Sequence, residues 1–585
     1  MNMSTYRNLR GARLRLLMRA LSFVLVVLAL SSCDSSQQPS ITPTAGADCP
    51  NHPAKPVTLT MSYGSEKQAW IDDVVKTFNT VCAGSITVKA TPLGSGDSMQ
   101  AILDGDEPDI WSPAGSVWLT LLNQEWKETH GGADIIASGP TDTPSLVTSP
   151  VVIAMWKSEA EALGWPNKPI GWADIAALST NPQGWAAYGH PEWGEFKFGH
   201  THPDSSNSGL DAVIAENYAA VNKTRGLTAD DVNNQTTKEF VANVESSVIH
   251  YGDSTGFFAT KMFNGGPSYL SAAVMYESLV VQANDGKTYP KISGPVVAIY
   301  PKEGTFYSDH PFAILQADWV TADKKAAALA FRDFLLKPAQ QQKALQYGFR
   351  PADLSIKIGA PLDSAHGVDA NQPKSVLQVP SVDVIRAVKA SWDEQRRKVD
   401  VMLILDRSGS MNDPVGGTSK IEAAKQGLAE FVGLLGDSDG LGLTVFSTNA
   451  NVLTPIDALG PKRQNILTTI QGIIADGSTR LFDTVAEQYE SLNALQTKHI
   501  KAIVVLTDGE DTISQRTSDQ LLQLVTPSGE NAGQGVKIFT IAYGDSIPDG
   551  TIQALKDIAN AAGGQEYAGN PQNIKQVYEA ISKFF

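Results

Sequence analysis

Residues 399–410 read VDVMLILDRSGS, and this stretch decides the fold of the C-terminal part of the chain. The mostly apolar run Val399–Leu405 is typical of a parallel strand that is buried on both faces. Asp406, Ser408 and Ser410 follow as D-x-S-x-S on the loop that leaves this strand. Open α/β sheets bind their ligands at that edge. Because the loop offers only oxygen ligands, it favours a hard divalent cation: Mg²⁺ first, or else Mn²⁺ or Ca²⁺.

Two later segments supply further oxygen ligands. Thr479 stands just ahead of an expected helix, and Asp508 ends the apolar run of residues 503–506. D-x-S-x-S alone is common in surface turns, but the three segments together resemble the metal-ion-dependent adhesion site of von Willebrand factor type A domains. The family usually has two glycines before the threonine, where this chain has Gly477-Ser478. The resemblance implies five direct or water-mediated metal ligands: Asp406, Ser408, Ser410, Thr479 and Asp508. It also implies a protein partner that offers a carboxylate to the metal.

The pattern around these motifs predicts an α/β fold. Strands are expected at 443–446 and 536–541, and apolar residues at helical spacing mark helices at 421–435, 552–559 and 574–581. Strands that alternate with helices of this length predict a doubly wound, Rossmann-like parallel sheet that is covered on both faces. Asp483 and Asp511, which lie close in sequence to Thr479 and Asp508, are not expected to be metal ligands; they are expected to cap helices or to face solvent.

The N-terminus indicates where the chain works. Five Arg residues precede the apolar run Ala20–Leu30, which is too short to span a membrane and suits the core of a signal peptide. The run leads into Leu-Ser-Ser-Cys at 30–33, which resembles the bacterial lipobox. That resemblance implies a lipid on Cys33, which would anchor an extracytoplasmic protein to a membrane, at the cell surface or on the periplasmic face. An ordinary secretory signal with an incidental cysteine is the alternative.

Cysteine count and composition set further limits. With Cys33 lipidated, Cys49 and Cys82 remain, and an exported pair is expected to form a disulfide, with two free thiols as the alternative. A chain of 585 residues is expected to hold two or three domains. The net charge of −16 repels nucleic acid and gives no basic patch for a membrane surface.

The middle of the chain repeats a strand, a Ser/Gly loop and a helix. Strands are expected at 57–61 and 86–90, each followed by a Ser/Gly loop, and exposed amides at such helix starts suit an anion or a carboxylate. A second lobe is expected to begin at about residue 146. Within this lobe, the loop 202–209 is expected to lead into a helix. The apolar run 295–300 is expected to be a strand that returns to the first lobe.

This order resembles the two-lobed extracellular solute-binding proteins of ABC importers, of the molybdate and sulfate type. More closely, it resembles a bacterial family in which such a domain is fused to a C-terminal von Willebrand A domain. The resemblance covers about 56–375 and implies a small solute or oxyanion held in a cleft by hydroxyls and amides of both lobes. Its candidate ligand-binding residues are Ser62, Ser65, Ser95, Ser206, Asn207, Ser208 and Tyr276. Each of them could instead serve as a helix cap.

The sequence gives little support to a histidine metal site or to an enzymatic activity. His200 and His202, with Asp204, suggest a metal, but their spacing fits no helical pair, so a loop histidine bonded to backbone is the expectation. No nucleophile-elbow, P-loop or H-E-x-x-H motif occurs, so we expect a binding protein and not an enzyme.

The sequence therefore predicts five regions: a lipoprotein signal peptide (1–32), a flexible tether (33–55), a two-lobed periplasmic-binding-protein-like domain (56–375), a connecting helix or linker (376–397) and a von Willebrand A domain (398–585). The predicted function is a lipid-anchored extracytoplasmic binding protein with an adhesion site for protein partners. The alternatives are the substrate-binding component of an ABC importer, or a surface adhesin whose N-terminal domain no longer binds solute.

Overall fold

A computed structural model describes residues 49, 53, 55–137, 139, 141–527, 535–544 and 547–585. Cys33 and the expected signal peptide lie outside these residues, as does most of the expected tether. Within the described ranges, no helix combines the length and the apolar character needed to cross a membrane.

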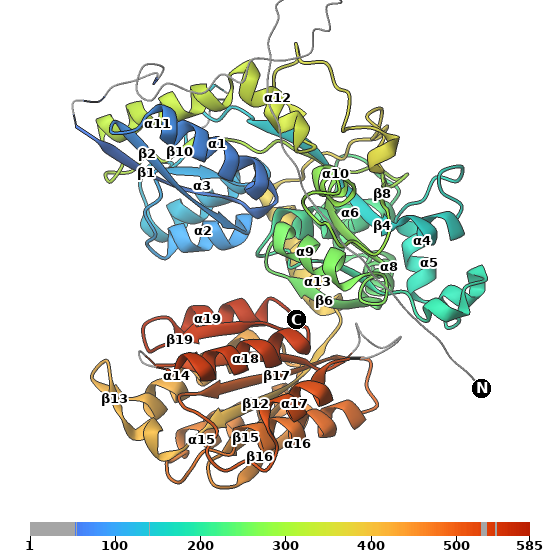
Figure 1. Ribbon diagram of the computed structural model, residues 1–585. Coiled ribbons are helices and arrows are strands. Elements are labelled where there is room, and N and C mark those ends of the chain that lie inside the picture. Colours follow the sequence, from blue (N-terminus) through green and yellow to red (C-terminus); the bar gives the residue numbers. More distant parts are fainter. Residues whose placement is uncertain are drawn as a thin grey trace, which may run out of the picture. The chain divides into compact units, whose positions relative to one another are not determined.

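The first sheet has four strands in the order β10-β3-β1-β2 (Figure 1). β1 pairs in parallel with β2 and β3, and β10 runs antiparallel to β3. Helix α1 buries Trp70, Val74 and Phe78, which recur at helical spacing on one face. The strands are β1 (Val57–Gly64), β2 (Ile86–Leu93), β3 (Ile110–Ser112) and β10 (Ala313–Ile314). The helices of this lobe are α1 (Gln68–Val81), α2 (Ser95–Leu103), α3 (Val117–His130), α11 (Ala322–Leu335) and α12 (Pro338–Gln346).

The second sheet follows the order β11-β4-β7-β5-β6, with β8 and β9 also paired to β4. Its strands are β4 (Val147–Trp156), β5 (Phe198–Thr201), β6 (Val248–Gly252), β7 (Ala272–Tyr276), β8 (Val296–Ile299), β9 (Tyr307–Ser308) and β11 (Arg350–Pro351). Its helices are α4 (Lys157–Ala162), α5 (Trp172–Ser179), α6 (Asn207–Ala220), α7 (Ala229–Asn233), α8 (Gln235–Glu245), α9 (Thr255–Gly265) and α10 (Glu277–Asn284).

One expected strand is in a different sheet. The run at 295–300 forms β8, but β8 pairs antiparallel with β4 and does not return to the first lobe. The chain returns through β10, which has only two residues and so carries no alternation that a sequence pattern could reveal. The side chains of β8 are buried, which explains its apolar composition equally well in either sheet.

Helix α13 (Val382–Gln395) lies in the expected connecting segment. It buries Val384, Ile385, Val388 and Trp392 and packs against α6, α7 and α8 of the second lobe. The connecting segment is therefore a packed element and not a free linker.

The third sheet has the order β16-β15-β12-β17-β18-β19, with β12 at its centre (Figure 1). Alternate residues of β12 enter different cores: Val401 and Leu403 pack in a cluster with α14, α15 and α19, while Met402 and Ile404 pack with α16, α17 and α18. The strands are β12 (Val399–Asp406), β15 (Gly440–Phe446), β16 (Ala450–Ala458), β17 (Ile500–Thr507), β18 (Lys537–Tyr543) and β19 (Glu566–Gly569). The helices are α14 (Lys420–Leu434), α15 (Arg463–Gln471), α16 (Leu481–Ala494), α17 (Ser518–Val525), α18 (Asp549–Ala561) and α19 (Ile574–Ser582).

The expectation of an entirely parallel sheet is wrong at one edge. β16 runs antiparallel to β15, while the other pairings in this sheet are parallel. β16 is largely exposed and contains Pro455, which lacks the amide proton that a central strand needs. Because this edge strand is interrupted by Asn451, Thr454, Pro455 and Asp457, it gives no continuous apolar run, so the pattern did not predict it.

Candidate functional site

The carboxyl ends of β12 and β17 bring the predicted metal ligands to one edge of the third sheet. The two strands are parallel neighbours with Leu405 paired to Leu506, so Asp406 and Asp508 follow at adjacent strand ends. Ser408 and Ser410 come next, on the loop and 3-10 turn after β12. The topology therefore places two carboxylates and two hydroxyls together.

Asp406 is fully buried and held by two donors. The Ser408 amide donates to Oδ1 over 2.7 Å, and the Thr507 hydroxyl donates to Oδ2 over 2.6 Å. Burial raises the pKa of Asp406 to about 6, and these hydrogen bonds oppose part of that rise. Thr507 was not predicted from the sequence, although its place beside Asp508 at the end of a strand was visible there.

The remaining donors form a chain across the loop. The Ser408 and Ser410 hydroxyl oxygens lie 3.1 Å apart, and the Ser410 hydroxyl donates to Asp508 Oδ1 over 2.8 Å. The other oxygen of Asp508 accepts from the Lys420 ammonium over 2.7 Å. The positive charge of Lys420 therefore already lies beside the Asp508 carboxylate.

Thr479 is buried beside the same edge, but its backbone holds it there. Its amide donates to the Thr512 hydroxyl over 2.9 Å, and its carbonyl accepts from the Thr512 amide over 2.8 Å. In the part of the chain that the structure describes, no hydrogen bond joins the Thr479 hydroxyl to the other four predicted ligands. The Gly409 amide donates to the Gly477 carbonyl over 3.0 Å, which ties the two loops together.

Asp511 and Asp483 each accept hydrogen bonds from two backbone amides. Asp511 accepts from the amides of Leu481 and Phe482 at the start of α16. Asp483 accepts from the amides of Gln515 and Arg516. Both carboxylates are therefore committed to backbone amides and lie outside the candidate metal site.

The donor set fits a hard divalent cation. Asp406 and Asp508 supply two negative charges, the hydroxyls supply neutral oxygens, and no sulfur or imidazole takes part. Both carboxylates already accept hydrogen bonds from protein donors on each oxygen, so either could contact a cation directly or through water.

Most of the predicted cleft residues already have hydrogen-bond partners within the protein, and some of those partners belong to the other lobe. The Asn207 side chain donates to Asp211, Tyr276 and Ser308 over 2.7–3.1 Å and accepts from the Trp118 indole over 3.0 Å. Trp118, Asp211 and Ser308 were not predicted from the sequence, because they come from separate elements that only the fold unites.

The start of α2 bonds to the chain itself. The amides of Gly96 and Asp97 donate to the Ser205 carbonyl over 2.7 and 3.1 Å. The Ser95 hydroxyl accepts from the Ala114 amide over 3.0 Å. The predicted anion position at this helix start is thus taken by a backbone carbonyl of the second lobe.

The other predicted hydroxyls form a second bridge. Ser206 and Ser208 each contact the Thr255 hydroxyl, at 2.9 and 2.8 Å, and the Ser65 hydroxyl accepts from the Gly256 amide over 2.9 Å. Ser62 is half-buried on β1 and, among the described residues, makes no hydrogen bond to the rest of this set. Six of the seven predicted residues therefore have hydrogen-bond partners in the described structure, and the Ser65–Gly256 bond joins the two lobes.

Comparison with known proteins identifies both folds. The family model of bacterial extracellular solute-binding proteins matches residues 59–350, and that of the von Willebrand factor type A domain matches residues 401–510. The chain joins a solute-binding domain to a von Willebrand A domain. This confirms the two-domain resemblance and the α/β fold class, in which the sheets are mixed parallel and antiparallel.

The relatives are distant. An uncharacterized protein of Mycobacterium tuberculosis H37Rv is 23% identical over 482 residues, which are 78% of this chain and 65% of the relative. The chain thus spans 65% of the length of that relative. A UPF0353 protein of Mycolicibacterium paratuberculosis is 26% identical over 204 residues, which are 32% of this chain and 61% of the relative.

Solved structures resemble each domain separately. A sulfate-binding protein of Mycobacterium tuberculosis H37Rv is 19% identical with a TM-score of 0.36, covering 51% of this chain and 88% of that one. A von Willebrand factor type A structure from Catenulispora acidiphila is 20% identical with a TM-score of 0.27, covering 32% of this chain and 42% of that one.

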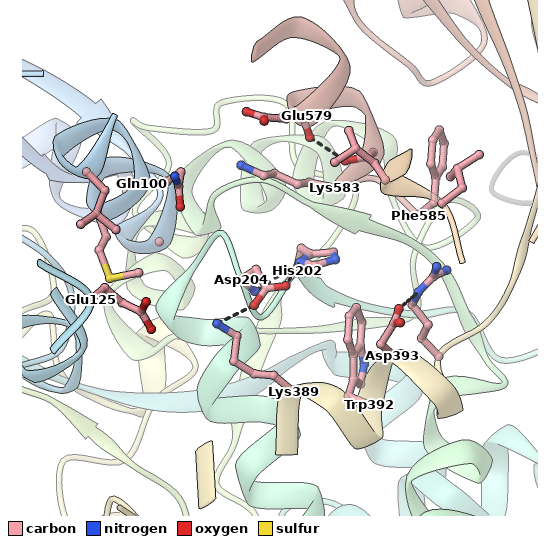
Figure 2. A pocket seen from close by; sticks show the side chains of 17 residues that line it. Gln100, Glu125, His202, Asp204, Lys389, Trp392, Asp393, Glu579, Lys583 and Phe585 are labelled. Carbon is pink, nitrogen blue, oxygen red and sulfur yellow. Dashed lines mark hydrogen bonds and ion pairs between the residues drawn. The ribbon is translucent and has the colours of Figure 1, made fainter. Parts of the chain in front are cut away.

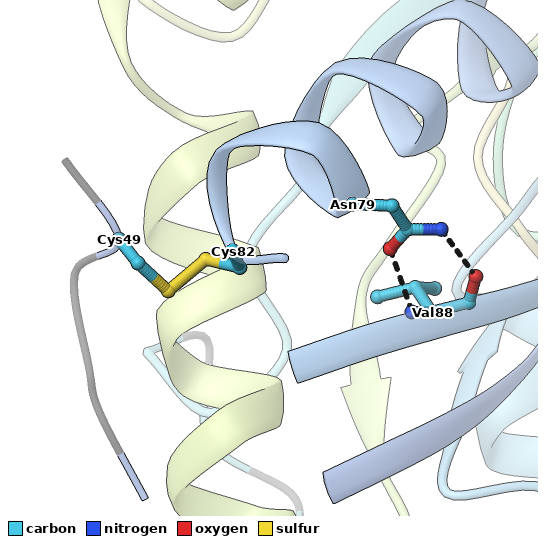
Figure 3. Close-up of a disulfide and its surroundings, with 4 residues drawn as sticks. All are labelled: Cys49, Asn79, Cys82 and Val88. Carbon is cyan, nitrogen blue, oxygen red and sulfur yellow. Dashed lines mark hydrogen bonds between the residues drawn. A yellow bond between two sulfur atoms is a disulfide. The ribbon is translucent and has the colours of Figure 1, made fainter. Parts of the chain in front are cut away.

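A disulfide joins Cys49 to Cys82, at the end of α1 in the solute-binding domain (Figure 3). The nearby Asn79 side chain donates to the Val88 carbonyl over 2.9 Å and accepts from the Val88 amide over 2.8 Å, which fixes α1 to β2. The disulfide therefore ties Cys49 to the end of α1, and the Asn79 contacts hold α1 against the first sheet.

A pocket of about 660 Å³ lies beside the α2 start (Figure 2). Asp204 and the Lys389 ammonium form an ion pair of 2.5 Å there, and the His202 ring packs edge-on against Trp392 with 4.8 Å between centroids. Burial lowers the pKa of His202 to about 4. His202 and Asp204 thus line this pocket, where one packs against Trp392 and the other pairs with Lys389. His200 lies on β5 in the core and not on a loop as expected.

Proposed function

We propose that this protein is an extracytoplasmic binding protein whose von Willebrand A domain captures a protein partner through a divalent cation. The observation that carries the proposal is the hydrogen-bonded chain from Ser408 through Ser410 to Asp508 beside buried Asp406. Asp406, Ser408, Ser410, Thr479 and Asp508 would hold the ion, each directly or through water. The ion would supply positive charge for a carboxylate of the partner.

Calorimetric titration of Mg²⁺ into the mature chain tests this proposal. Asp406→Ala should abolish the binding heat, because it removes a buried carboxylate at the centre of the site. Asp457→Ala is the matched control, since Asp457 is an exposed carboxylate paired with Lys462 on the same domain. Unchanged Mg²⁺ affinity in Asp406→Ala contradicts the proposal.

The solute-binding domain supports a second candidate, a receptor for a small solute or oxyanion. The amides of Gly96 and Asp97 give a concrete place for such a ligand, which would displace the Ser205 carbonyl. Thermal shifts against oxyanions, sugars, amino acids and metal chelates test this candidate. A ligand at about 100 times its dissociation constant stabilises the protein by about 2.7 kcal/mol, which is readily seen. If no class of compound shifts the melting temperature, the candidate metal site remains the proposed functional site.

We further propose that a lipid on Cys33 holds the protein to a membrane. The lipobox-like sequence at 30–33 supports this proposal. Cys33→Ser should move the protein from the membrane fraction to the soluble fraction, and continued anchoring of that variant would rule the lipid out.

A further inference from the structure

A buried cluster in the second lobe of the solute-binding domain brings one imidazole and two carboxylates together. His200 of β5, Glu216 of α6 and Glu245 at the end of α8 are each 0% exposed. One ligand atom from each of the three lies within 4.8 Å of the others. Among the described residues, no Lys or Arg side chain pairs with either glutamate.

The imidazole of His200 turns a lone pair toward a carboxylate. Its Nδ1 lies 2.8 Å from the Thr201 carbonyl, which can only accept, so Nδ1 carries a proton. In a neutral ring, Nε2 then bears a lone pair, yet Nε2 lies 2.9 Å from Glu245 Oε1. This contact needs either a proton shared between the two atoms or a cation bound beside them.

His250 shows how the same arrangement is satisfied without a cation. It is buried on β6, and its Nδ1 lies 2.9 Å from the Tyr251 carbonyl. Its Nε2, however, meets the hydroxyl of Tyr269, which can donate a proton. The two histidines differ in what faces Nε2, a hydroxyl for His250 and a carboxylate for His200.

Glu216 supplies the second, independent observation. Both of its carboxylate oxygens are buried without a hydrogen-bond partner in the described structure. Protonation alone would not satisfy this side chain, because a carboxyl proton would still need an acceptor. Such an unpartnered carboxylate beside the imidazole is a strong cost unless a cation binds it.

We propose that His200, Glu216 and Glu245 bind a structural transition-metal ion of the Zn²⁺ class. One imidazole nitrogen and two carboxylate oxygens suit zinc, whose bonds to them measure about 2.0–2.2 Å. Ligand atoms on a tetrahedral zinc lie about 3.4 Å apart, so a pair now up to 4.8 Å apart must approach by up to about 1.4 Å, while His200 Nε2 and Glu245 Oε1, now 2.9 Å apart, must separate slightly.

The surroundings match those of metal ligands. The Thr201 carbonyl orients the imidazole, and the Tyr251 hydroxyl donates to Glu245 Oε2 over 2.6 Å, which holds that carboxylate in place. Because the site is closed to solvent, the ion is acquired during folding and stabilises this lobe. This site is distinct from the adhesion site, which offers only oxygen.

Metal analysis of the intact mature chain tests the inference. The protein carries Asp406→Ala to remove the adhesion site, is produced with Zn²⁺, and is dialysed against a chelator before elemental analysis. We expect about one equivalent of zinc, because a buried structural ion exchanges slowly. Adding Glu216→Gln should reduce the content at least about tenfold, whereas adding His250→Gln, the matched buried control, should leave it unchanged.

A second measurement covers a variant that fails to fold. The Asp406→Ala chain is unfolded with chelator and refolded with Co²⁺, whose visible absorption reports a site of low coordination number. The expected band should be present in this protein and absent after Glu216→Gln. Zinc below about 0.1 equivalents together with no Co²⁺ band would overturn the proposal and leave the cluster neutralised by protons alone. Equal loss of zinc in His250→Gln would also overturn it.

Discussion

At the scale of single residues, Lys420 adds a positive charge to the candidate metal site. Its ammonium lies 2.7 Å from Asp508 Oδ2 and 3.9 Å from Asp413, so it competes with any metal for Asp508. Lys420→Met keeps the aliphatic stem and removes the charge. We expect Mg²⁺ to bind about tenfold more tightly to this variant, equivalent to about 1.4 kcal/mol, in calorimetric titration. Weaker binding would mean that Lys420 supports the site.

Asp211 makes stability depend on pH. Burial raises the pKa of Asp211 to about 8, and nearby Asp309 adds to the rise. The unfolded chain has an ordinary Asp pKa of about 3.9, so the folded state binds the proton more tightly and stability falls as pH rises from about 4 to 8. Asp211→Asn should flatten this fall, by up to about 1.4 kcal/mol per pH unit. Urea midpoints at pH 5 and pH 8 check it.

The control for that measurement is Asp230→Asn, which changes an exposed aspartate near the start of α7. The exposed change should leave the pH dependence as in the unmodified protein. An unchanged slope in Asp211→Asn would show that the carboxyl is already charged in the folded state.

At the scale of elements, the disulfide covalently attaches the end of α1 to Cys49. It closes a loop between residues 33 positions apart, from Cys49 to Cys82. On chain-entropy grounds, closing such a loop destabilises the unfolded chain by about 3.7 kcal/mol. Reductant, or the variant Cys82→Ser, should therefore lower the melting temperature of the mature chain. An identical melting curve with and without reductant would show that the bond contributes nothing to stability.

The start of α2 shows how far an element can be predicted. The Gly94–Ser98 loop and the helix from 99 were expected, but α2 begins at Ser95, so the glycine-rich loop is itself helical. Its exposed amides were expected to bind an anion, and they bind the Ser205 carbonyl in this structure. The amide chemistry was predictable from the local sequence. The acceptor was not, because it comes from the other lobe.

At the scale of the whole molecule, Gly96 controls the closed contact between the lobes. A Cβ at this position would lie 1.8 Å from the Asp204 carbonyl oxygen, so a side chain there forces the two segments apart. Gly96→Ala should open the cleft and raise the radius of gyration in X-ray scattering by on the order of 1 Å. Gly433→Ala is the control, since nothing lies within 4 Å of a Cβ there. Equal scattering from both variants would contradict the predicted opening.

The sequence by itself determined the two-domain order, the α/β class and the oxygen-only character of the candidate metal site. These features depend on local chemistry: a buried strand is apolar, and Asp406, Ser408 and Ser410 follow it directly. Tertiary structure alone decided which sheet β8 joins, that Lys420 faces Asp508, and that the cleft hydroxyls bond each other. It also decided that His200 meets Glu216 and Glu245 and not His202. Such contacts join positions far apart in sequence, where local pattern carries no information about the partner that packing selects.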